Sequence, residues 1–572
     1  MEKIIKIRKL MRQFKLDGYL VPKNDEFFGE YVPDNKDNLK FLSGFNGSYG
    51  FALILKNKNY LFVDGRYTLQ AKMQAGREFN IITIPQKIPF DVLKNKKISI
   101  GFDPKLHTEF SLLNIFKKTK CRLVSINKNF VENIWIKKKE SKFKKFYVID
   151  SKNIGQNPVN KINKVIKILK KNKSDLQFIS SPENISWLIN IRGSDSKYTP
   201  LPYSYLVLDK KKNISLFCNI QKIDKKIRKH LKDVKIYDLR NLDKFLYNFK
   251  GKTIQIDKKT CSLFYKNIIK KKNKIIEIDD PVYLLKSVKN KVEITNTIKS
   301  HIYDGAALTK FLFWLKKNFN KKKITEINAQ EKLLEYRKNN KHFKFLSFPT
   351  ISGSGPNGAI IHYKASKRTN RVLKKGDIYL VDSGGQYNFG TTDVTRTVSL
   401  ENKNDRIKNI FTRVLKGHIA VANFKIKKNT TGAIIDFAAR KSLREINLDY
   451  EHGTGHGVGY FLNVHEGPQA ISRGNKVKLK KGMIISNEPG YYEKGKFGIR
   501  IENLITVYKA GNFFKFKNLT MAPIDKTLIK KSLLNESEIK WLNDYHFQVF
   551  KNINKYMNKF ELTELKKSCS SI

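Results

Sequence analysis

Cysteine is scarce in this chain. The 572 residues include four, Cys121, Cys218, Cys261 and Cys569, which lie far apart and without C-x-x-C spacing. This scarcity excludes a disulfide framework and a zinc site built from thiolates. The chain also lacks a run of about eighteen uncharged apolar residues, and basic residues interrupt its first twenty positions. We therefore expect neither a transmembrane helix nor a secretory leader, and we predict a cytoplasmic location.

Acidic residues are outnumbered, because 51 Asp and Glu stand against 113 Lys and Arg and give a formal net charge of +62. Charge alone suggests nucleic acid or an anionic membrane surface as a partner, since lysine-rich surfaces release counterions from phosphate polymers. The lysines are nevertheless spread through the whole chain, which is typical of a compositional bias, and no base-reading helix is evident. We expect no membrane binding and only nonspecific, salt-sensitive contact with nucleic acid.

The length of the chain predicts two to four domains, because 572 residues exceed what one hydrophobic core organises. Residues 1–155 predict an α/β domain with an N-terminal amphipathic helix and strands at 18–21, 52–55 and 60–63. Residues 156–286 repeat this pattern, with a linker at 156–158, a helix from Lys161 and strands at 176–179, 205–208 and 214–217. We expect two related α/β domains in tandem, followed by a third domain over residues 287–572.

The third domain is expected to begin with a long amphipathic helix from Lys289. A glycine-rich passage at 352–358 lacks the Lys-Ser/Thr pair of a phosphate loop, so we interpret it as a tight loop. Strands at 378–382 and 391–398 should bring Asp382 and Asp393 together, and helices at 404–424 and 432–446 follow. A helix from Glu536, capped by Asn535, is predicted to end the fold.

The segment from His452 to His465 contains three histidines and four glycines in fourteen residues. Glycine permits close backbone approach, so this composition indicates a loop that presents nitrogen ligands or proton carriers. The isolated His418, in contrast, is interpreted as a packed or surface residue without a chemical role. In the stretch 497–503, alternation with a period of two places Arg500 and Glu502 on one face of a strand.

Four carboxylates in the third domain each follow apolar residues: Asp382, Asp393, Glu488 and Glu502. Acids buried together require positive charge, and two divalent cations would balance four negative charges. Oxygen-rich ligation with one imidazole favours Mn²⁺ or Co²⁺, with Zn²⁺ as a further candidate. Salt bridges to the many lysines are the competing explanation for these acids.

Six short motifs are the most specific features of the chain: Gly-Ala-Ile-Ile-His-Tyr at 358–363, Val-Asp-Ser-Gly at 381–384, Thr-Asp-Val-Thr-Arg-Thr at 392–397, His-Gly-Thr-Gly-His-Gly-Val-Gly at 452–459, Asn-Glu-Pro-Gly at 487–490 and Arg-Ile-Glu-Asn at 500–503. With them, the chain resembles the long-form aminopeptidase P family of Xaa-Pro aminopeptidases, which have the pita-bread dinuclear metallopeptidase fold. The resemblance extends over nearly the whole chain, from Phe41 to His546.

This resemblance implies an α/β fold in which two related α/β N-terminal domains precede a pita-bread catalytic domain with a curved antiparallel sheet. It also implies two divalent ions, for which Mn²⁺ is favoured, and a homodimer. The implied metal ligands are Asp382, Asp393, His456, Glu488 and Glu502. The implied catalytic or substrate-side residues are His362, His452, His465 and Glu488, with Arg66 contacting substrate and Arg500 orienting the carboxylates.

The expected reaction is the attack of a metal-bridging hydroxide on the carbonyl before a penultimate proline, which releases one N-terminal residue from a peptide. His362 and His465 are expected to stabilise the oxyanion, and Glu488 to transfer the proton. One alternative is a prolidase, which shares the five ligands and cleaves only Xaa-Pro dipeptides. The other is a catalytically inactive binding scaffold, which the complete ligand set disfavours.

Overall fold

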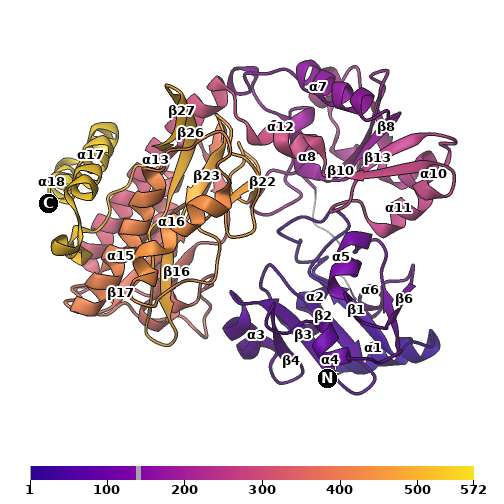
Figure 1. Cartoon of the computed structure of the whole chain (residues 1–572), viewed down its shortest axis with the longest axis horizontal. Coiled ribbons are helices and arrows are strands. Elements are labelled where there is room, and N and C mark those ends of the chain that lie inside the picture. Colours follow the sequence, from indigo (N-terminus) through magenta and orange to yellow (C-terminus); the bar gives the residue numbers. More distant parts are fainter. Residues whose placement is uncertain (1, 137–142) are drawn as a thin grey trace. The chain divides into compact units, whose positions relative to one another are not determined.

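The computed structural model describes residues 2–136 and 143–572 (Figure 1). The chain divides into two compact units, of which unit 1 comprises Met1–Ile149 and Gln156–Tyr283, and unit 2 comprises Asp150–Gly155 and Leu284–Ile572. Both α/β segments expected from the sequence thus belong to unit 1. The domain boundaries at 155 and 286 stay predictions.

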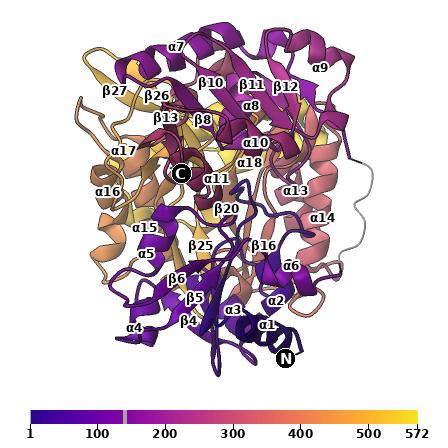
Figure 2. The same cartoon turned by 90° about the vertical axis from the view of Figure 1, so that its right-hand side faces the viewer.

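Unit 1 contains two six-stranded sheets with the same topology. The first has the order β4-β3-β2-β1-β5-β6, and the second has the order β12-β11-β10-β8-β13-β14. Figure 2 labels β8 and β10–β13 of the second sheet. In both, the first strand along the chain pairs antiparallel with the second and parallel with the fifth. The strands are β1 (Gly18–Pro22), β2 (Phe51–Leu55), β3 (Asn59–Asp64), β4 (Asn80–Ile84), β5 (Ser99–Phe102), β6 (Arg122–Ser125), β8 (Leu176–Ile179), β10 (Ser204–Asp209), β11 (Ile214–Cys218), β12 (Lys235–Asp238), β13 (Thr253–Asp257) and β14 (Lys274–Ile278). The predicted tandem of related α/β folds is confirmed.

Most helices that accompany these sheets are short, although α1 has 12 residues and α7 has 14. They are α1 (Glu2–Gln13), α2 (Asn38–Ser43), α3 (Thr68–Ala75), α4 (Pro89–Leu93), α5 (Glu109–Ile115), α6 (Phe130–Ile134), α7 (Pro158–Lys171), α8 (Pro182–Leu188), α9 (Lys225–His230), α10 (Leu242–Tyr247), α11 (Leu263–Lys270) and α12 (Pro281–Ser287), and two short strands, β7 (Tyr147–Val148) and β9 (Ile191–Arg192), pair with each other. The predicted start of α7 at Lys161 was wrong. Asn157 caps this helix by accepting a hydrogen bond from the Asn160 amide, and Pro158 occupies the first turn, where its missing N–H costs nothing.

Unit 2 contains six helices of 11 to 28 residues: α13 (Lys291–Asn318), α14 (Glu326–Lys338), α15 (Asp405–Ala422), α16 (Gly432–Arg444), α17 (Glu536–Ile553) and α18 (Lys559–Cys569). Helices α15 and α16 lie side by side (Figure 1). Asn535 caps α17 as predicted, because its side chain accepts from the Glu538 amide. The prediction that this helix ends the fold was wrong, since Asn558 caps α18 in the same way.

The strands of unit 2 pair antiparallel in four sheets. The sheets are β16-β17-β20, β22-β21-β23-β26-β27, β24-β25 and β15-β18-β19. Their strands are β15 (Phe343–Leu346), β16 (Ile351–Ser354), β17 (Ile378–Ser383), β18 (Gly385–Tyr387), β19 (Gly390–Thr391), β20 (Val394–Ser399), β21 (Gly455–Gly457), β22 (Glu466–Ile471), β23 (Ile484–Asn487), β24 (Gly490–Glu493), β25 (Phe497–Arg500), β26 (Asn503–Ala510) and β27 (Phe513–Asn518).

Two strands predicted as continuous are interrupted in the structure. The stretch 391–398 divides between β19 and β20, and the stretch 497–503 divides between β25 and β26. Asp393 lies in the first interruption and Glu502 in the second. At the second break the sequence pattern gave no sign of the interruption, because Phe497, Ile499, Ile501 and Ile505 keep a period of two. At the first, the β-branched residues on both sides of Asp393 are equally typical of a continuous strand.

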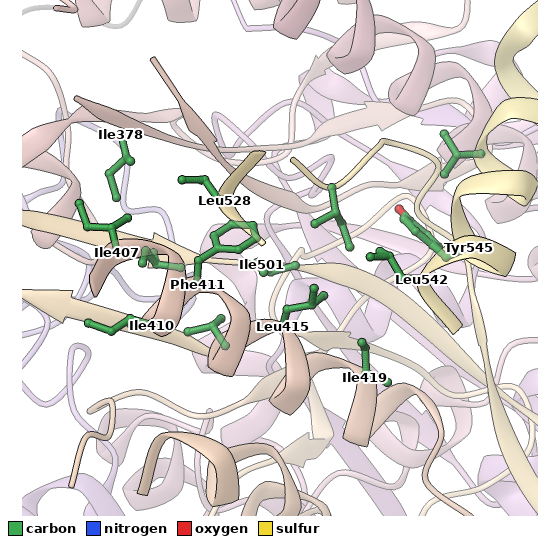
Figure 3. Close-up of a cluster of buried hydrophobic side chains, with 14 of the residues drawn as sticks. Ile378, Ile407, Ile410, Phe411, Leu415, Ile419, Ile501, Leu528, Leu542 and Tyr545 are labelled. Carbon is green, nitrogen blue, oxygen red and sulfur yellow. The ribbon is translucent and has the colours of Figure 1, made fainter. Parts of the chain in front are cut away.

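A hydrophobic cluster supports the segment between β25 and β26 (Figure 3). Phe411 and Leu415 of α15 are spaced by four residues and pack together with Leu542 of α17. Ile499 and Ile501 are buried in the same cluster, at 0% and 1% exposure, and each contributes roughly 1.5–3 kcal/mol of burial free energy. These two isoleucines anchor the segment that carries Arg500 and Glu502.

Candidate metal centre

Two aspartates lie at the same end of the β17–β20 ladder. Asp382 is the next-to-last residue of β17 and pairs with Thr395 of β20, while Asp393 directly precedes β20. Asp382 is 8% exposed and Asp393 is 4% exposed. The predicted juxtaposition of the two acids therefore follows from the antiparallel register.

Two glutamates take up related positions on the β23–β26 ladder. Asn487 ends β23 and pairs with Asn503, which begins β26. Glu488 directly follows β23 and Glu502 directly precedes β26, so both glutamates lie at the same end of this ladder. The backbone N–H of Glu488 donates to the carbonyl of Thr454 at 2.8 Å, and that of Glu502 donates to the carbonyl of Thr395 at 3.2 Å. These two bonds join the glutamates to β20 and to the histidine-rich segment.

His456 lies on β21 and faces the carboxylates through one nitrogen. Its Nδ1 lies 2.9 Å from the carbonyl of Gly457, to which an Nδ1–H would donate. The Nε2 atom lies 3.4 Å from Asp393 Oδ2 and 3.5 Å from Glu488 Oε1. One ligand atom from each of Asp393, His456 and Glu502 lies within 4.8 Å of the other two, which is the geometry of groups that can share a metal ion.

The electrostatics of this cluster call for positive charge. Burial raises the pKa of Asp393 to about 6, aided by Asp382 and opposed by the hydrogen bond to His456. Burial and then the charges of Asp393 and Asp382 raise the pKa of Glu502 well above its usual range. Burial lowers the pKa of His456, but its interactions with Asp393 and Glu488 outweigh this effect and raise it to about 9. Carboxylates this close ionise together only if cations are bound among them.

The donor set fits divalent cations. Asp382 Oδ1 is buried and has no hydrogen-bond partner among the described residues, whereas its Oδ2 accepts from Arg500 Nη2 at 2.7 Å. A buried carboxylate oxygen without a partner is costly unless a cation binds it. Hard oxygen ligands with a single imidazole suit Mn²⁺, Co²⁺ or Zn²⁺.

Arg500 connects both halves of the cluster. Its Nε donates to Thr395 Oγ1 at 3.0 Å, and that hydroxyl donates to Glu502 Oε2 at 2.8 Å. Its Nη1 donates to the hydroxyl of Tyr492 at 2.6 Å. Arg500 is 2% exposed, so its guanidinium is held in one orientation between Asp382 and Glu502.

His452 contacts this arginine indirectly. Its Nε2 lies 2.9 Å from the Tyr492 hydroxyl, and its Nδ1 lies 2.8 Å from the carbonyl of Gly453. The sequence analysis missed Thr395 and Tyr492, because a threonine and a tyrosine in strands are typical of ordinary sheet positions. Only the pairing of distant strands shows that they connect His452, Arg500 and Glu502.

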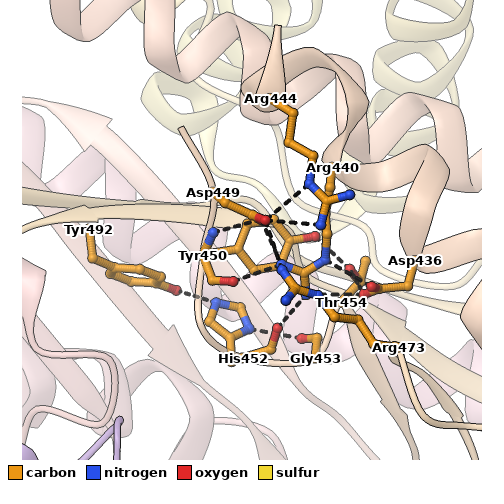
Figure 4. A network of polar contacts seen from close by, with 10 residues as sticks. All are labelled: Asp436, Arg440, Arg444, Asp449, Tyr450, His452, Gly453, Thr454, Arg473 and Tyr492. Atoms are coloured by element: carbon orange, nitrogen blue, oxygen red, sulfur yellow. Dashed lines mark hydrogen bonds and ion pairs between the residues drawn. The ribbon is translucent and has the colours of Figure 1, made fainter. Parts of the chain in front are cut away.

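Helix α16 holds the segment that contains His452 (Figure 4). Arg440 donates to the carbonyl of His452 at 2.6 Å and binds Asp436 and Asp449 at 2.8 and 2.7 Å. Asp436 also accepts from the hydroxyl of Thr454 at 2.6 Å. Because the carbonyl of Thr454 binds the amide of Glu488, this buried network fixes the backbone of both the histidine and the glutamate.

The other predicted site residues lie in different surroundings. The ring of His465 is exposed and packs against His456, with centroids 4.2 Å apart. His362 is half-buried and follows Ile361, whose carbonyl accepts from Arg500 Nη2 at 3.5 Å. Arg66 belongs to unit 1, where it binds Asp64 at 2.7 Å, and its contact with substrate stays a prediction.

A buried ion cluster adjoins His465 and was not predicted. The carboxylate of Glu466 accepts from Lys286 at 3.1 Å and from Lys289, and all three side chains are 1% exposed. Glu466 also pairs with Gly457 across the β21–β22 ladder. The cluster therefore fixes the start of β22, directly after His465, against the end of β21. His418 is fully buried with Nδ1 3.1 Å from the carbonyl of Asn487, so its interpretation as a packed residue is confirmed.

Comparisons with known families cover the chain from end to end. Residues 296–509 match metallopeptidase family M24, and residues 512–572 match the C-terminal region of that family. Residues 3–131 and 137–293 each match the creatinase/prolidase N-terminal domain. In the part of the chain that the structure describes, helices lack the length and apolarity required to span a bilayer.

Comparisons with individual proteins agree with these family matches. The chain is 38% identical to a probable Xaa-Pro aminopeptidase P from Laccaria bicolor, in an alignment that covers 100% of this chain and 93% of that protein. The crystal structure of X-prolyl aminopeptidase from Caenorhabditis elegans, described as a cytosolic enzyme with a di-nuclear active site, matches with a TM-score of 0.95 and 34% identity, covering 100% of this chain and 99% of that one. A prolidase from Pyrococcus horikoshii is similar in fold, with 24% identity and a TM-score of 0.52 over 64% of this chain and 99% of its own.

Proposed function

The chain belongs to metallopeptidase family M24 and to its aminopeptidase P members, and on this premise we propose that it removes the N-terminal residue from peptides whose second residue is proline. It is a metallo-aminopeptidase. The observation that carries the proposal is the convergence of Asp393, His456 and Glu502 within 4.8 Å in a buried cluster of acids. The similarity to Xaa-Pro aminopeptidases extends over the full length of the chain.

Two divalent cations, for which Mn²⁺ is our first choice, are assigned to five ligands: Asp382, Asp393, His456, Glu488 and Glu502. When bound, the cations supply the charge that lowers the pKa of a water molecule and polarises a carbonyl group. Arg500 and Thr395 keep Asp382 and Glu502 oriented through the hydrogen bonds described above.

The remaining steps are assigned to side chains of this chain. Glu488 accepts a proton from the attacking water and returns it to the leaving nitrogen of proline. The hydroxyl of Ser486 donates to Glu488 Oε1 at 3.0 Å and holds that carboxylate in place. His362 and His465 donate hydrogen bonds to the substrate carbonyl as it becomes an oxyanion, and Arg66 contacts the substrate. His452 supports Tyr492 and through it Arg500.

Proline at the second position explains why such a dedicated enzyme is needed. Its ring fixes φ and removes the amide N–H, so the preceding bond requires a site shaped for a tertiary amide. A peptide that continues beyond proline gains binding free energy that can stabilise the transition state. An Xaa-Pro dipeptide lacks these contacts, and its carboxylate would need a dedicated cation.

The test compares Arg-Pro-Pro with Gly-Pro and Ala-Pro at equal concentration, before and after removal of metal with a chelator and addition of Mn²⁺. We expect release of arginine from the tripeptide, slow turnover of the dipeptides, and loss of activity on chelation. Faster cleavage of the dipeptides would make the enzyme a prolidase, and metal-independent cleavage would contradict the assigned ligands. Elemental analysis should give two divalent ions per chain.

We further propose a cytoplasmic homodimer with peptides as its partners. The location is supported by the description of the C. elegans enzyme as cytosolic. Sedimentation velocity at several protein concentrations tests the dimer, and a single species of 66.6 kDa would refute it.

A further inference from the structure

A buried carboxylate outside the metal centre gathers one whole segment of the chain. Glu326 is the first residue of α14 and is 0% exposed. Its two oxygens accept hydrogen bonds from four groups, all between positions 354 and 371. The donors are the Ser354 amide at 2.8 Å, Asn357 Nδ2 at 3.0 Å, the Tyr363 hydroxyl at 2.8 Å and the Arg371 amide at 3.0 Å.

All four donors are neutral, so the charge of Glu326 is stabilised by directed hydrogen bonds and by the amino end of α14. The guanidinium of Arg371 faces Asp377 at 3.4 Å. Burial raises the pKa of Glu326, and the bonds from Ser354, Arg371 and Tyr363 oppose that rise. A backbone hydrogen bond also connects Glu326 to this segment, because the Glu326 amide donates to the carbonyl of Arg371 at 3.0 Å.

The segment held in this way carries His362, one residue before Tyr363. The ring of Tyr363 packs with Ile351 and Leu380 of the β16–β17 ladder. On the other side of His362, the carbonyl of Ile361 accepts from Arg500 Nη2, which also binds Asp382. His362 therefore lies between one attachment to Glu326 and one to the arginine of the metal centre.

Backbone contact reinforces the second attachment. A Cβ on Gly498 of β25 would lie 1.8 Å from the carbonyl oxygen of Gly358, so only glycine fits there. Gly358 belongs to a 3₁₀ helix, η4 (Gly355–Ala359), within the held segment. The predicted tight loop at 352–358 is thus built as the end of β16 and a helical turn, and the turn lies directly against β25.

We propose that Glu326 is a positioning residue: its buried carboxylate holds residues 354–371 so that His362 is presented at the metal centre. The proposal rests on the substrate-side role proposed for His362. A carboxylate is required because each oxygen must accept from several donors. The amide of glutamine would place an NH₂ group against donors and leave at least one of them unpaired.

The experiment compares Glu326→Gln with Glu335→Gln, an exposed glutamate on the same helix whose partner is Lys332. Four quantities are measured: hydrogen exchange of peptides within 354–371, bound metal, kcat and KM for Arg-Pro-Pro. For Glu326→Gln we expect exchange in that segment at least ~10-fold faster, kcat at least ~10-fold lower, KM within ~3-fold of the parent enzyme, and unchanged metal content. Glu335→Gln should match the parent enzyme in all four.

The proposal is overturned if Glu326→Gln exchanges and turns over like the control, or if its loss of activity follows a loss of metal. A second arm places Glu326→Gln in a His362→Ala background, where its cost in kcat should fall below ~2-fold, because residues that act through one another are not additive. An undiminished cost there would show that Glu326 acts elsewhere.

Failure of the proposed function gives a different result. If His362→Ala alone kept full activity, the substrate-side role of His362 would be refuted. Faster hydrogen exchange in Glu326→Gln would still show that Glu326 holds residues 354–371. If Glu326→Gln did not fold, Tyr363→Phe removes one of the four donors and keeps the ring in its apolar contacts. That variant should exchange faster within 354–371 and lose at least ~3-fold in kcat with its metal retained, and parent-like values would overturn the proposal.

Discussion

Substituting Glu466 with glutamine should destabilise unit 2 in a way that depends on pH. Glu466 is the counter-ion of Lys286 and Lys289, and the three side chains are 1% exposed. Burial already lowers the pKa of Lys289, although the charge of Glu466 and its hydrogen bond oppose the effect. Glutamine removes this compensation and leaves two buried ammonium groups, which the folded variant can avoid by releasing a proton.

The cost follows from the pKa of free lysine. Deprotonating one lysine at pH 7, about 3.4 units below its ordinary pKa of about 10.4, costs about 4 to 5 kcal/mol. This agrees with the roughly 3–5 kcal/mol measured when one partner of a buried ion pair is removed. The unfolded variant binds one more proton than the folded variant below about pH 10, so its stability rises with pH. The penalty should therefore shrink by about 1.4 kcal/mol per pH unit, to roughly 2 kcal/mol at pH 9.

Hydrogen exchange of peptides from β22 and α13, followed as urea is increased at pH 7, 8 and 9, measures this free energy within unit 2. The control is Glu564→Gln, which breaks an exposed pair with Lys567 and should cost less than about 1 kcal/mol at every pH. A Glu466→Gln protein as stable as the control at pH 7, or a penalty that grows with pH, would refute the reasoning. The triple variant Lys286→Met, Glu466→Leu and Lys289→Met should lose far less free energy of unfolding than Glu466→Gln, because this cluster then buries no charge.

Four further results are expected. Asp393→Ala should lose both bound metal and activity, and elemental analysis that finds the parent metal content would contradict its assignment as a ligand. His465→Ala should lose far more in kcat than in metal, so a folded but metal-free variant would show that ligand and substrate-side roles were confused. Arg500→Lys should reduce kcat/KM at least ~30-fold, equivalent to about 2 kcal/mol, because lysine cannot bind Asp382, Thr395 and Tyr492 at once; near-normal kinetics would refute this. Burial lowers the pKa of His546 to about 3, so between pH 6.5 and 3 the unfolded chain binds one more proton than the folded chain. The free energy of unfolding therefore falls by about 1.4 kcal/mol for each unit by which the pH is lowered. In acid unfolding, His546→Gln should lose stability less steeply with falling pH than the parent protein, and an unchanged slope would contradict this.

Much of the fold was accessible from local patterns. Six strands of unit 1, β1, β2, β3, β8, β10 and β11, were predicted to within one or two residues, because their apolar runs end at glycine and polar turns. The other six strands of the two sheets, β4, β5, β6, β12, β13 and β14, were not predicted. The cap at Asn535 was also predictable from the sequence, since Asn followed three positions later by Glu is typical of a capping box. The helix from Lys559 was missed because its sequence is mostly polar and its cap, Asn558, follows closely on the preceding helix.

For the candidate site as well, some features could be predicted from the sequence and others could not. The chemical types of its ligands could be read from the motifs, and the structure brings Asp393, His456 and Glu502 together, while their roles as ligands stay predictions. Among the residues that orient them, Arg500 was expected from the resemblance, whereas Thr395 and the ion cluster around Glu466 were not. Thr395 and Glu502 are 107 positions apart, and Glu466 lies 180 positions from Lys286.

By itself, the sequence determined many of the helices and strands, the cap at Asn535, the tandem of related α/β folds and the set of carboxylates and imidazoles available for metal binding. These depend on neighbours within a turn or a strand, where the period of apolar residues and the chemistry of single side chains suffice. Tertiary structure alone decided that Arg500 connects Asp382 to Glu502, that Glu326 holds the segment of His362, and that Glu466 is paired with two buried lysines. Such contacts depend on strand register and on how helices pack against sheets, and these are set by the burial of whole faces far apart in the chain.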